Sequence, residues 1–369
     1  MASVADPTAA STSLQDEKAA AAAAASFASS SSPSSDRIKK LIVSPPPSSS
    51  VPSAAVLTPD QQSKYDGLLA QARAWTEVKC TSAGHAEKSG PLTDADRQWL
   101  TRECLLRYLR ATLWNPKAAE KRLLETLAWR REYGVDALTP DHISVENETG
   151  KQVILSFDND ARPCLYLSPG HQNTDPSPRQ VQHLVFMLER VIELMPAGQE
   201  KVTLLINFKS SKRRSNSAPG LGLAREVLHI LQTHYPERLG RALIINVPWV
   251  VTGFFKLITP FIDPMTRDKL KFNEDMRQYV HEDQLWTEFG GGKLEFEYDH
   301  AVYWPVMNDV CKEKRDFYAA RWVAGGKQVG ELETYFAGAA AKGVGPIAAA
   351  PPPAAAAVDA EAESTPVVQ

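Results

Sequence analysis

The chain has 369 residues, of which 43% are hydrophobic and 23% are charged, and its formal net charge is -3. This balance excludes a strongly basic nucleic-acid-binding protein. The four cysteines show no CxxC or histidine spacing, which predicts neither a zinc site nor a disulfide framework. We therefore expect a protein of a reducing compartment, the cytoplasm.

Both ends of the chain have a composition that predicts disorder. Residues 1–56 are rich in Ala, Ser and Pro, and residues 339–369 are rich in Ala and Pro. Such segments bury too little apolar surface to offset the entropy of ordering. The basic island of Arg37, Lys39 and Lys40 is interpreted as part of a solvated linker rather than as a localisation signal.

Residues 57–137 are predicted to form an N-terminal helical domain. An apolar stripe runs through LLRYLRATLWNPKAAEKRLLETLAWRREYGV. Asn115 and Pro116 mark the start of a helix within it, because proline suits the first helical turn. Gly134 marks the end of the same helix.

Residues 138–300 are predicted to form a second domain around a mostly parallel sheet, followed by a C-terminal helical extension at residues 301–338. A helix stopped by Pro236 separates two strand candidates, which indicates a βαβ unit. A further helix is expected to begin with a cap at Ser177. The strand candidates lie at residues 153–157, 164–167, 202–208, 242–247 and 269–272, and a short helix is expected at residues 282–289.

The sequence GFFKLITPFI, residues 253–262, predicts an unusual helix that is apolar on almost every side. Such a helix lies deep in a core or at a membrane, and the pattern alone does not decide between the two. Gly253 and Pro260 are interpreted as a hinge and a kink that bracket it. Interrupting polar and proline residues exclude a transmembrane helix, so any membrane contact should be peripheral.

Several blocks carry a resemblance to a known family. YPERLGRALIINVPW followed by PFIDPMTRDKL resembles the CRAL-TRIO lipid-binding domain of the yeast secretory phosphatidylinositol-transfer family, and the helical block above resembles the small domain that precedes it. LRATLW, RQVQHLVFMLERVIELMPAGQ and EVLHILQTHYPERLG are similar to one fungal subgroup, linked to azole resistance and lipid droplets. The resemblance runs from about residue 92 to 320. It implies an α/β fold with flanking helices and a gate helix over a lipid pocket.

The resemblance also implies a headgroup site. Glu237 of the YPER turn, Thr266 and Lys269 match headgroup-binding positions of the family, and Asp158 matches an acidic one. Thr266 and Lys269 are three residues apart, so a hydroxyl and an ammonium can share one phosphate. The gate residues expected to contact a membrane are Gly253, Phe254, Phe255, Leu257, Ile258, Phe261 and Ile262.

The sequence also departs from the family. Founding members carry an arginine and a lysine after LRA, where this chain has Thr112 and Leu113. Two hydroxyls that hold phosphatidylcholine there are replaced by Val202 and Leu204, with Thr203 on the opposite strand face. We therefore expect poor phosphatidylcholine binding and retained phosphatidylinositol binding.

Two groups of cations have an open interpretation. Arg107 and Arg110 are interpreted as exposed or salt-bridged scaffold, with ligand contact as the alternative. Lys212, Arg213 and Arg214 are interpreted as a solvated loop, with an anionic-lipid contact or a kinase recognition site as alternatives.

No catalytic or metal-ligand constellation is evident in the sequence, and we expect neither catalysis nor a cofactor. The resemblance implies a monomeric phosphatidylinositol-binding and transfer protein. It would be in peripheral contact with the endoplasmic reticulum, lipid droplets and the cell periphery. The alternatives are a carrier of a sterol, squalene or another neutral isoprenoid, and a module that presents lipid to a phosphoinositide kinase.

Overall fold

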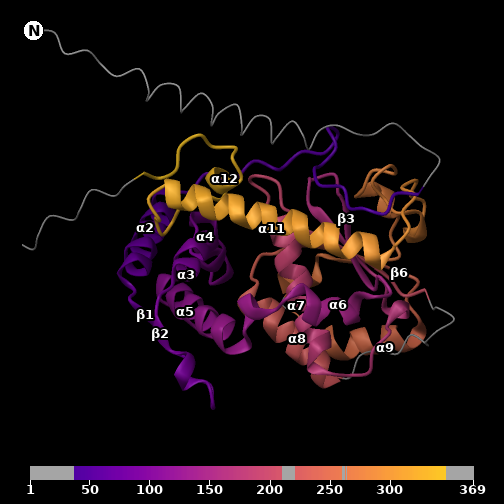
Figure 1. The fold of residues 1–369 in the computed structure, drawn as a ribbon, viewed down its shortest axis with the longest axis horizontal. Coiled ribbons are helices and arrows are strands. Elements are labelled where there is room, and N and C mark those ends of the chain that lie inside the picture. Colours follow the sequence, from indigo (N-terminus) through magenta and orange to yellow (C-terminus); the bar gives the residue numbers. More distant parts are fainter. Residues whose placement is uncertain (1–36, 210–220, 260–261, 263, 346–369) are drawn as a thin grey trace, which may run out of the picture.

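The computed structural model describes residues 37–209, 221–259, 262 and 264–345. The basic loop at residues 212–214 lies outside the described residues, and so do Pro260, Phe261 and Asp263. Figure 1 shows a helical domain at the left and a sheet-containing domain at the right.

The helical domain has its own apolar core, built from helices whose ends are capped by side chains. Thr58 and Gln61 form a capping box at its first helix, and the Asn115 side chain accepts the amide of Ala118. Gly134 ends the last helix with φ 76°, as the sequence predicts. The helices are α2 (Pro59–Ala74), α3 (Asp94–Trp99), α4 (Arg102–Ala111) and α5 (Pro116–Tyr133). A small antiparallel pair, β1 (Glu77–Val78) and β2 (Gly90–Pro91), and the 3-10 turn η1 (Ala86–Lys88) accompany them.

The second domain is built on a five-stranded sheet of order β3-β4-β5-β6-β7. The β3–β4 pair is antiparallel and the other three pairs are parallel, which confirms the predicted mostly parallel sheet. Helix α8 connects β5 to β6 and completes the predicted βαβ unit. The strands are β3 (Gln152–Phe157), β4 (Pro163–Leu167), β5 (Val202–Asn207), β6 (Leu239–Ile245) and β7 (Leu270–Phe272).

Helices and short turns cover the sheet and link its strands. Ser177 occupies the N-cap position of α7, as predicted, but its side chain makes no capping hydrogen bond. The helices are α6 (Pro140–Ser144), α7 (Pro178–Glu193), α8 (Leu221–His234), α9 (Trp249–Ile258) and α10 (Pro264–Arg267). The 3-10 turns are η2 (Val135–Ala137), η3 (Val145–Asn147), η4 (Pro169–His171), η6 (Met276–Gln278) and η7 (Thr287–Phe289).

Two predicted elements differ from the structure. The apolar helix α9 begins at Trp249, so Gly253 lies inside it and does not bracket it. Residues 282–289 form turns and η7 rather than a helix. Trp286 there forms an isolated parallel bridge with Leu294, which holds this stretch in an extended turn.

The C-terminal extension ties the two domains together. Helix α11 (His300–Ala324) runs along the upper edge of both domains in Figure 1 and is followed by α12 (Glu333–Phe336). Between them Val329 is buried in the core of the helical domain. Residues 339–345, expected to be disordered, fold back, since the Val344 amide donates to Glu331.

Residues 37–43, here called the edge segment, correct the prediction that residues 1–56 are disordered throughout. The Ile42 amide donates to the carbonyl of Leu155 on the edge strand β3 at 2.8 Å. Leu41 is only 7% exposed and belongs to the main core. The edge segment therefore covers the lateral edge of the sheet at β3.

The basic island within the edge segment is also part of the fold. Lys39 pairs with Asp299 at 3.1 Å, and Arg37 pairs with Glu295 at 3.6 Å. Both acidic partners lie just before α11. The interpretation of this island as a solvated linker is therefore wrong.

Replacing Leu41 with alanine should lower the free energy of unfolding by about 2–3 kcal/mol, because a buried leucine leaves a cavity when it is truncated. Urea denaturation measures this change. The exposed neighbour Lys40 is the control, since Lys40→Ala should change stability by less than about 0.5 kcal/mol. Equal stabilities for the two variants would contradict docking of the edge segment.

Candidate functional site

The parallel strands β4 to β7 all begin at one edge of the sheet, here called the amino edge. Glu237 lies two residues before β6, Lys269 directly before β7, and Thr266 in α10. Asp158 follows β3, whose antiparallel direction brings its end to the same edge. The four predicted site residues therefore all lie at the amino edge, spread from β3 to β7.

Lys269 and Thr266 are tied to this edge through their backbones. The Lys269 carbonyl accepts the amide of Ala242 on β6 at 2.9 Å, and its amide donates to the Thr266 carbonyl at 3.1 Å. Both side chains are half-buried. A hydroxyl and an ammonium thus come from one short turn, as the sequence spacing predicts.

Asp158 is fully buried and holds the turn between β3 and β4. Its carboxylate accepts the Thr203 hydroxyl at 2.6 Å, the amides of Asp160 and Arg162 at 2.9 Å, and the Arg162 guanidinium at 3.4 Å. Burial raises the pKa of Asp158, while the Thr203 hydroxyl acts to lower it. Four donors fill a carboxylate's capacity, so a headgroup contact would require one of these bonds to open.

Glu237 adopts an uncommon backbone conformation with φ 63°. A non-glycine residue stays in this left-handed region only where its surroundings fix it. The guanidinium of Arg110, from α4 of the helical domain, donates through Nε to Oε2 of Glu237 at 3.3 Å. A predicted site residue is therefore held by the other domain.

The ion pair between Arg110 and Glu237 is the last in a longer series of ion pairs, which we call the ion-pair chain. Oε2 of Glu200 accepts Nη2 of Arg110 at 3.0 Å and Nη1 of Arg107 at 2.8 Å. Nη2 of Arg107 donates to Oε1 of Glu333 on α12 at 2.7 Å. The salt-bridged interpretation of Arg107 and Arg110 is confirmed. No local sequence pattern indicates their acidic partners, which lie far away along the polypeptide.

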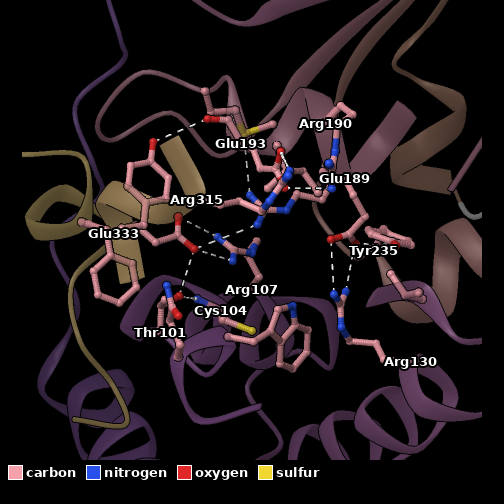
Figure 2. Close-up of a pocket in the computed structure, with 18 of the residues that line it drawn as sticks. Thr101, Cys104, Arg107, Arg130, Glu189, Arg190, Glu193, Tyr235, Arg315 and Glu333 are labelled. Carbon is pink, nitrogen blue, oxygen red and sulfur yellow. Dashed lines mark hydrogen bonds and ion pairs between the residues drawn. The ribbon is translucent and has the colours of Figure 1, made fainter. Parts of the chain in front are cut away.

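A cleft of about 530 Å³ lies where the helical domain, the sheet domain and the C-terminal helices meet. Figure 2 shows Arg107 and Glu333 on one side of it. Arg130 contacts Glu189 at 2.9 Å, and Arg315 contacts Glu193 at 2.6 Å. The charged side chains that line the cleft are therefore largely paired with one another. None of the four predicted site residues lines this cleft.

Glu333 in the ion-pair chain and Glu103 beside it, which accepts the Glu333 backbone amide at 2.8 Å, have opposite electrostatic surroundings. Burial acts to raise the pKa of Glu333, but the charges of Arg107 and Arg238 outweigh it and hold that pKa well below its usual value. Burial, reinforced by the charge of Glu333, raises the pKa of Glu103 to about 7. Glu333 is thus an ion-pair anchor, whereas Glu103 is a poorly solvated acid.

The predicted gate residues fall in and after α9. Leu257 is 61% exposed, and a side chain at Gly253 would meet no atom within 4 Å. Ile262 instead is buried, in a small cluster with Ala224. The side chains of Phe254, Phe255 and Ile258 and the whole of Phe261 lie outside the described residues.

Within the described ranges, no group of three or more His, Cys, Asp or Glu side chains is arranged to hold a metal ion. The helices of the same ranges include none that is long and apolar enough to cross a membrane.

Glu333→Gln should lower the free energy of unfolding by about 3 kcal/mol, because it leaves the buried Arg107 without one of its counter-charges. Chemical denaturation measures the loss. Glu103→Gln is the matched control in the same cluster and should lose little. A control variant as unstable as Glu333→Gln would contradict the different roles of the two glutamates.

The raised pKa of Glu103 also predicts that the stability of the protein depends on pH. The pKa of Glu103 is raised from 4.5 to about 7, so between these values the folded state binds more protons than the unfolded state. The stability contributed by Glu103 should therefore fall as pH rises through this window. Denaturation of wild type and Glu103→Gln at about pH 5 and about pH 8 should show a weaker loss in the variant.

Comparison with known proteins matches the family "CRAL/TRIO domain" to residues 147–291 and its N-terminal domain to residues 64–125. The chain is 53% identical over 282 residues to a CRAL-TRIO domain-containing protein of Schizosaccharomyces pombe, covering 76% of this chain and 28% of that protein. It is 48% identical over 227 residues to the phosphatidylinositol transfer protein PDR17 of Saccharomyces cerevisiae. This match covers 59% of this chain and 65% of that protein.

A SEC14 cytosolic factor of Kluyveromyces lactis is 28% identical over 236 residues, covering 58% of this chain and 77% of the relative. The chain spans less than two thirds of the length of the first two relatives. The two matched domains are the helical domain and the sheet domain described above, in the same order. The chain therefore belongs to the CRAL/TRIO family.

Proposed function

We propose that this protein binds phosphatidylinositol and moves it between membranes, with no covalent step. The observation that carries the proposal is the gathering of Glu237, Thr266 and Lys269 at the amino edge. A relative named as a phosphatidylinositol transfer protein, 48% identical, supports the choice of lipid. By the resemblance, the membranes would be those of the endoplasmic reticulum, lipid droplets and the cell periphery.

The chemistry of the three side chains suits such a headgroup. A lipid phosphate needs a cation or hydroxyl donors, which Lys269 and Thr266 supply from one turn. Inositol hydroxyls need acceptors, and the carboxylate of Glu237 is one. Asp158 would act indirectly, by holding the β3–β4 turn in place.

Lys269→Ala should reduce phosphatidylinositol exchange between vesicles by at least about tenfold, because it removes a charge-assisted bond to the phosphate. Transfer of radiolabelled phosphatidylinositol from donor to acceptor vesicles measures this rate. Lys201→Ala is the matched control, because Lys201 directly precedes β5, which begins at the same edge with β6 between it and β7. Exchange by Lys269→Ala at the wild-type rate would refute the headgroup role.

We also propose that α9 acts as a gate that opens at a bilayer. Its apolar sequence and the 61% exposure of Leu257 support contact with lipid. Transfer of two phenylalanine rings from water into lipid would contribute roughly 3–6 kcal/mol. This is enough to shift a two-state equilibrium of a few kcal/mol.

Phe254→Asp combined with Phe255→Asp should weaken vesicle binding and slow exchange, because two charges in the gate oppose insertion into lipid. Vesicle flotation and the exchange assay measure the two effects. Phe317→Asp, at a 43%-exposed phenylalanine on α11, is the control and should leave both unchanged. An unaltered rate in the double variant would rule out the gate.

The surface of β5 supports a preference against phosphatidylcholine. Val202 and Leu204 offer no hydroxyl, and the Thr203 hydroxyl is already bonded to Asp158. The same apolar positions favour one second candidate, a neutral isoprenoid such as a sterol in place of a phospholipid. Mass spectrometry of lipid extracted from the purified protein separates the candidates, since phosphatidylinositol supports the first and a sterol the second.

A further inference from the structure

The connection between the ion-pair chain and the amino edge points to a role for the helical domain in lipid selection. We propose that Arg110 and Glu200 are positioning residues that hold the Glu237 carboxylate for the hydroxyls of a polyol headgroup. This inference rests on the proposed function and extends it to residues that do not themselves touch the lipid.

Glu237 has an unusual local conformation. Its φ of 63° is a strained conformation for a residue with a side chain, and it follows directly after Pro236. The Glu237 side chain is 18% exposed, so it lies at the rim rather than in free solvent. A carboxylate on such a backbone needs a fixed partner to keep one orientation.

Arg110 engages only one oxygen of the Glu237 carboxylate. In the described part of the chain, Arg110 donates to Oε2 of Glu237, which leaves the acceptor capacity of Oε1 for a ligand hydroxyl. A carboxylate with one oxygen held by a guanidinium, and with the other oxygen able to accept a hydroxyl, suits a polyol. A headgroup with no hydroxyls would gain nothing from it.

Arg110 is itself held in place by a second carboxylate, that of Glu200. Glu200 binds its Nη2, and the same Glu200 oxygen binds Arg107, whose side chain is only 4% exposed. The Glu200 amide is in turn held by the Gln199 side chain, and the Glu200 carbonyl accepts Arg238 at 3.0 Å. The ion-pair chain thus runs from the buried interface between the domains to Glu237 at the amino edge.

A purely structural role, as glue between the domains, is the alternative. Arg130 provides the matched control, because its ion pair with Glu189 also joins α5 of the helical domain to α7 of the sheet domain. Arg130 is more buried than Arg110, with 10% against 31% of its side chain exposed. Its loss should therefore weaken domain docking at least as much.

The experiment is a double-mutant cycle with Arg110→Gln and Glu237→Gln in the full chain. Uptake of phosphatidylinositol from vesicles is compared with uptake of phosphatidic acid that carries the same acyl chains. Arg110→Gln should lower phosphatidylinositol uptake by about tenfold and leave phosphatidic acid uptake unchanged. In the Glu237→Gln background it should cause no further loss, because it acts through Glu237.

Equal losses for both lipids, additive losses in the cycle, or the same loss of selectivity in Arg130→Gln would overturn the positioning role. If Arg110→Gln does not fold, Glu200→Gln replaces it and should shift selectivity in the same direction. Wild-type uptake of phosphatidylinositol with an unaffected Arg110→Gln variant overturns this inference alone. A wild type that takes up no phosphatidylinositol overturns the proposed function as well.

Discussion

The guanidinium of Arg107 is the constraint on which the arrangement of the molecule depends. The helical domain and the sheet domain have separate apolar cores, and Trp129 and Tyr133 of α5 pack against the core of the sheet domain, so contacts at the interface, rather than burial within each core, fix how the two are oriented. Arg107 is 4% exposed and binds Glu200 of one domain and Glu333 of the C-terminal extension. A buried charge tolerates few alternative partners, so such a contact specifies one orientation even where its net contribution to stability is small.

That orientation matters because of where the candidate site lies. In open α/β sheets ligands commonly bind beyond the carboxyl ends of the strands, where helices point their positive ends. The amino edge is the opposite end, and α8 finishes there at His234 with the negative end of its dipole. An anionic headgroup at this edge would therefore need a cationic side chain such as Lys269, because the guanidinium of Arg110 is paired with Glu200 and Glu237.

The sequence predicted the elements whose signals are local. Asn115, Pro116 and Gly134 delimit α5 because capping depends on a few adjacent residues. The βαβ unit followed from hydrophobic periodicity and from Pro236. The order of the domains followed from the resemblance of contiguous sequence blocks.

The features that the sequence missed depend on distant partners. The edge segment has an apolar triplet from Leu41 to Val43, but its Ser- and Pro-rich neighbours hid that pattern, and its ordering depends on β3. The turn around Trp286 replaced a predicted helix because Leu294 offers it a bridge. Glu333 is more than two hundred residues from Arg107, and no local pattern links them.

The described contacts around α9 bear on the proposed gate. Ile262, just beyond this helix, packs in a small cluster with Ala224, Leu228 and Leu270 that is separate from the main core. Trp249 at the start of α9 is 86% exposed. Val251 of the same helix is fully buried, so opening of the proposed gate would expose this side chain, while the separate main core stays intact. The ion-pair chain holds the amino edge in place, so movement of α9 would change access to the sheet without displacing Glu237.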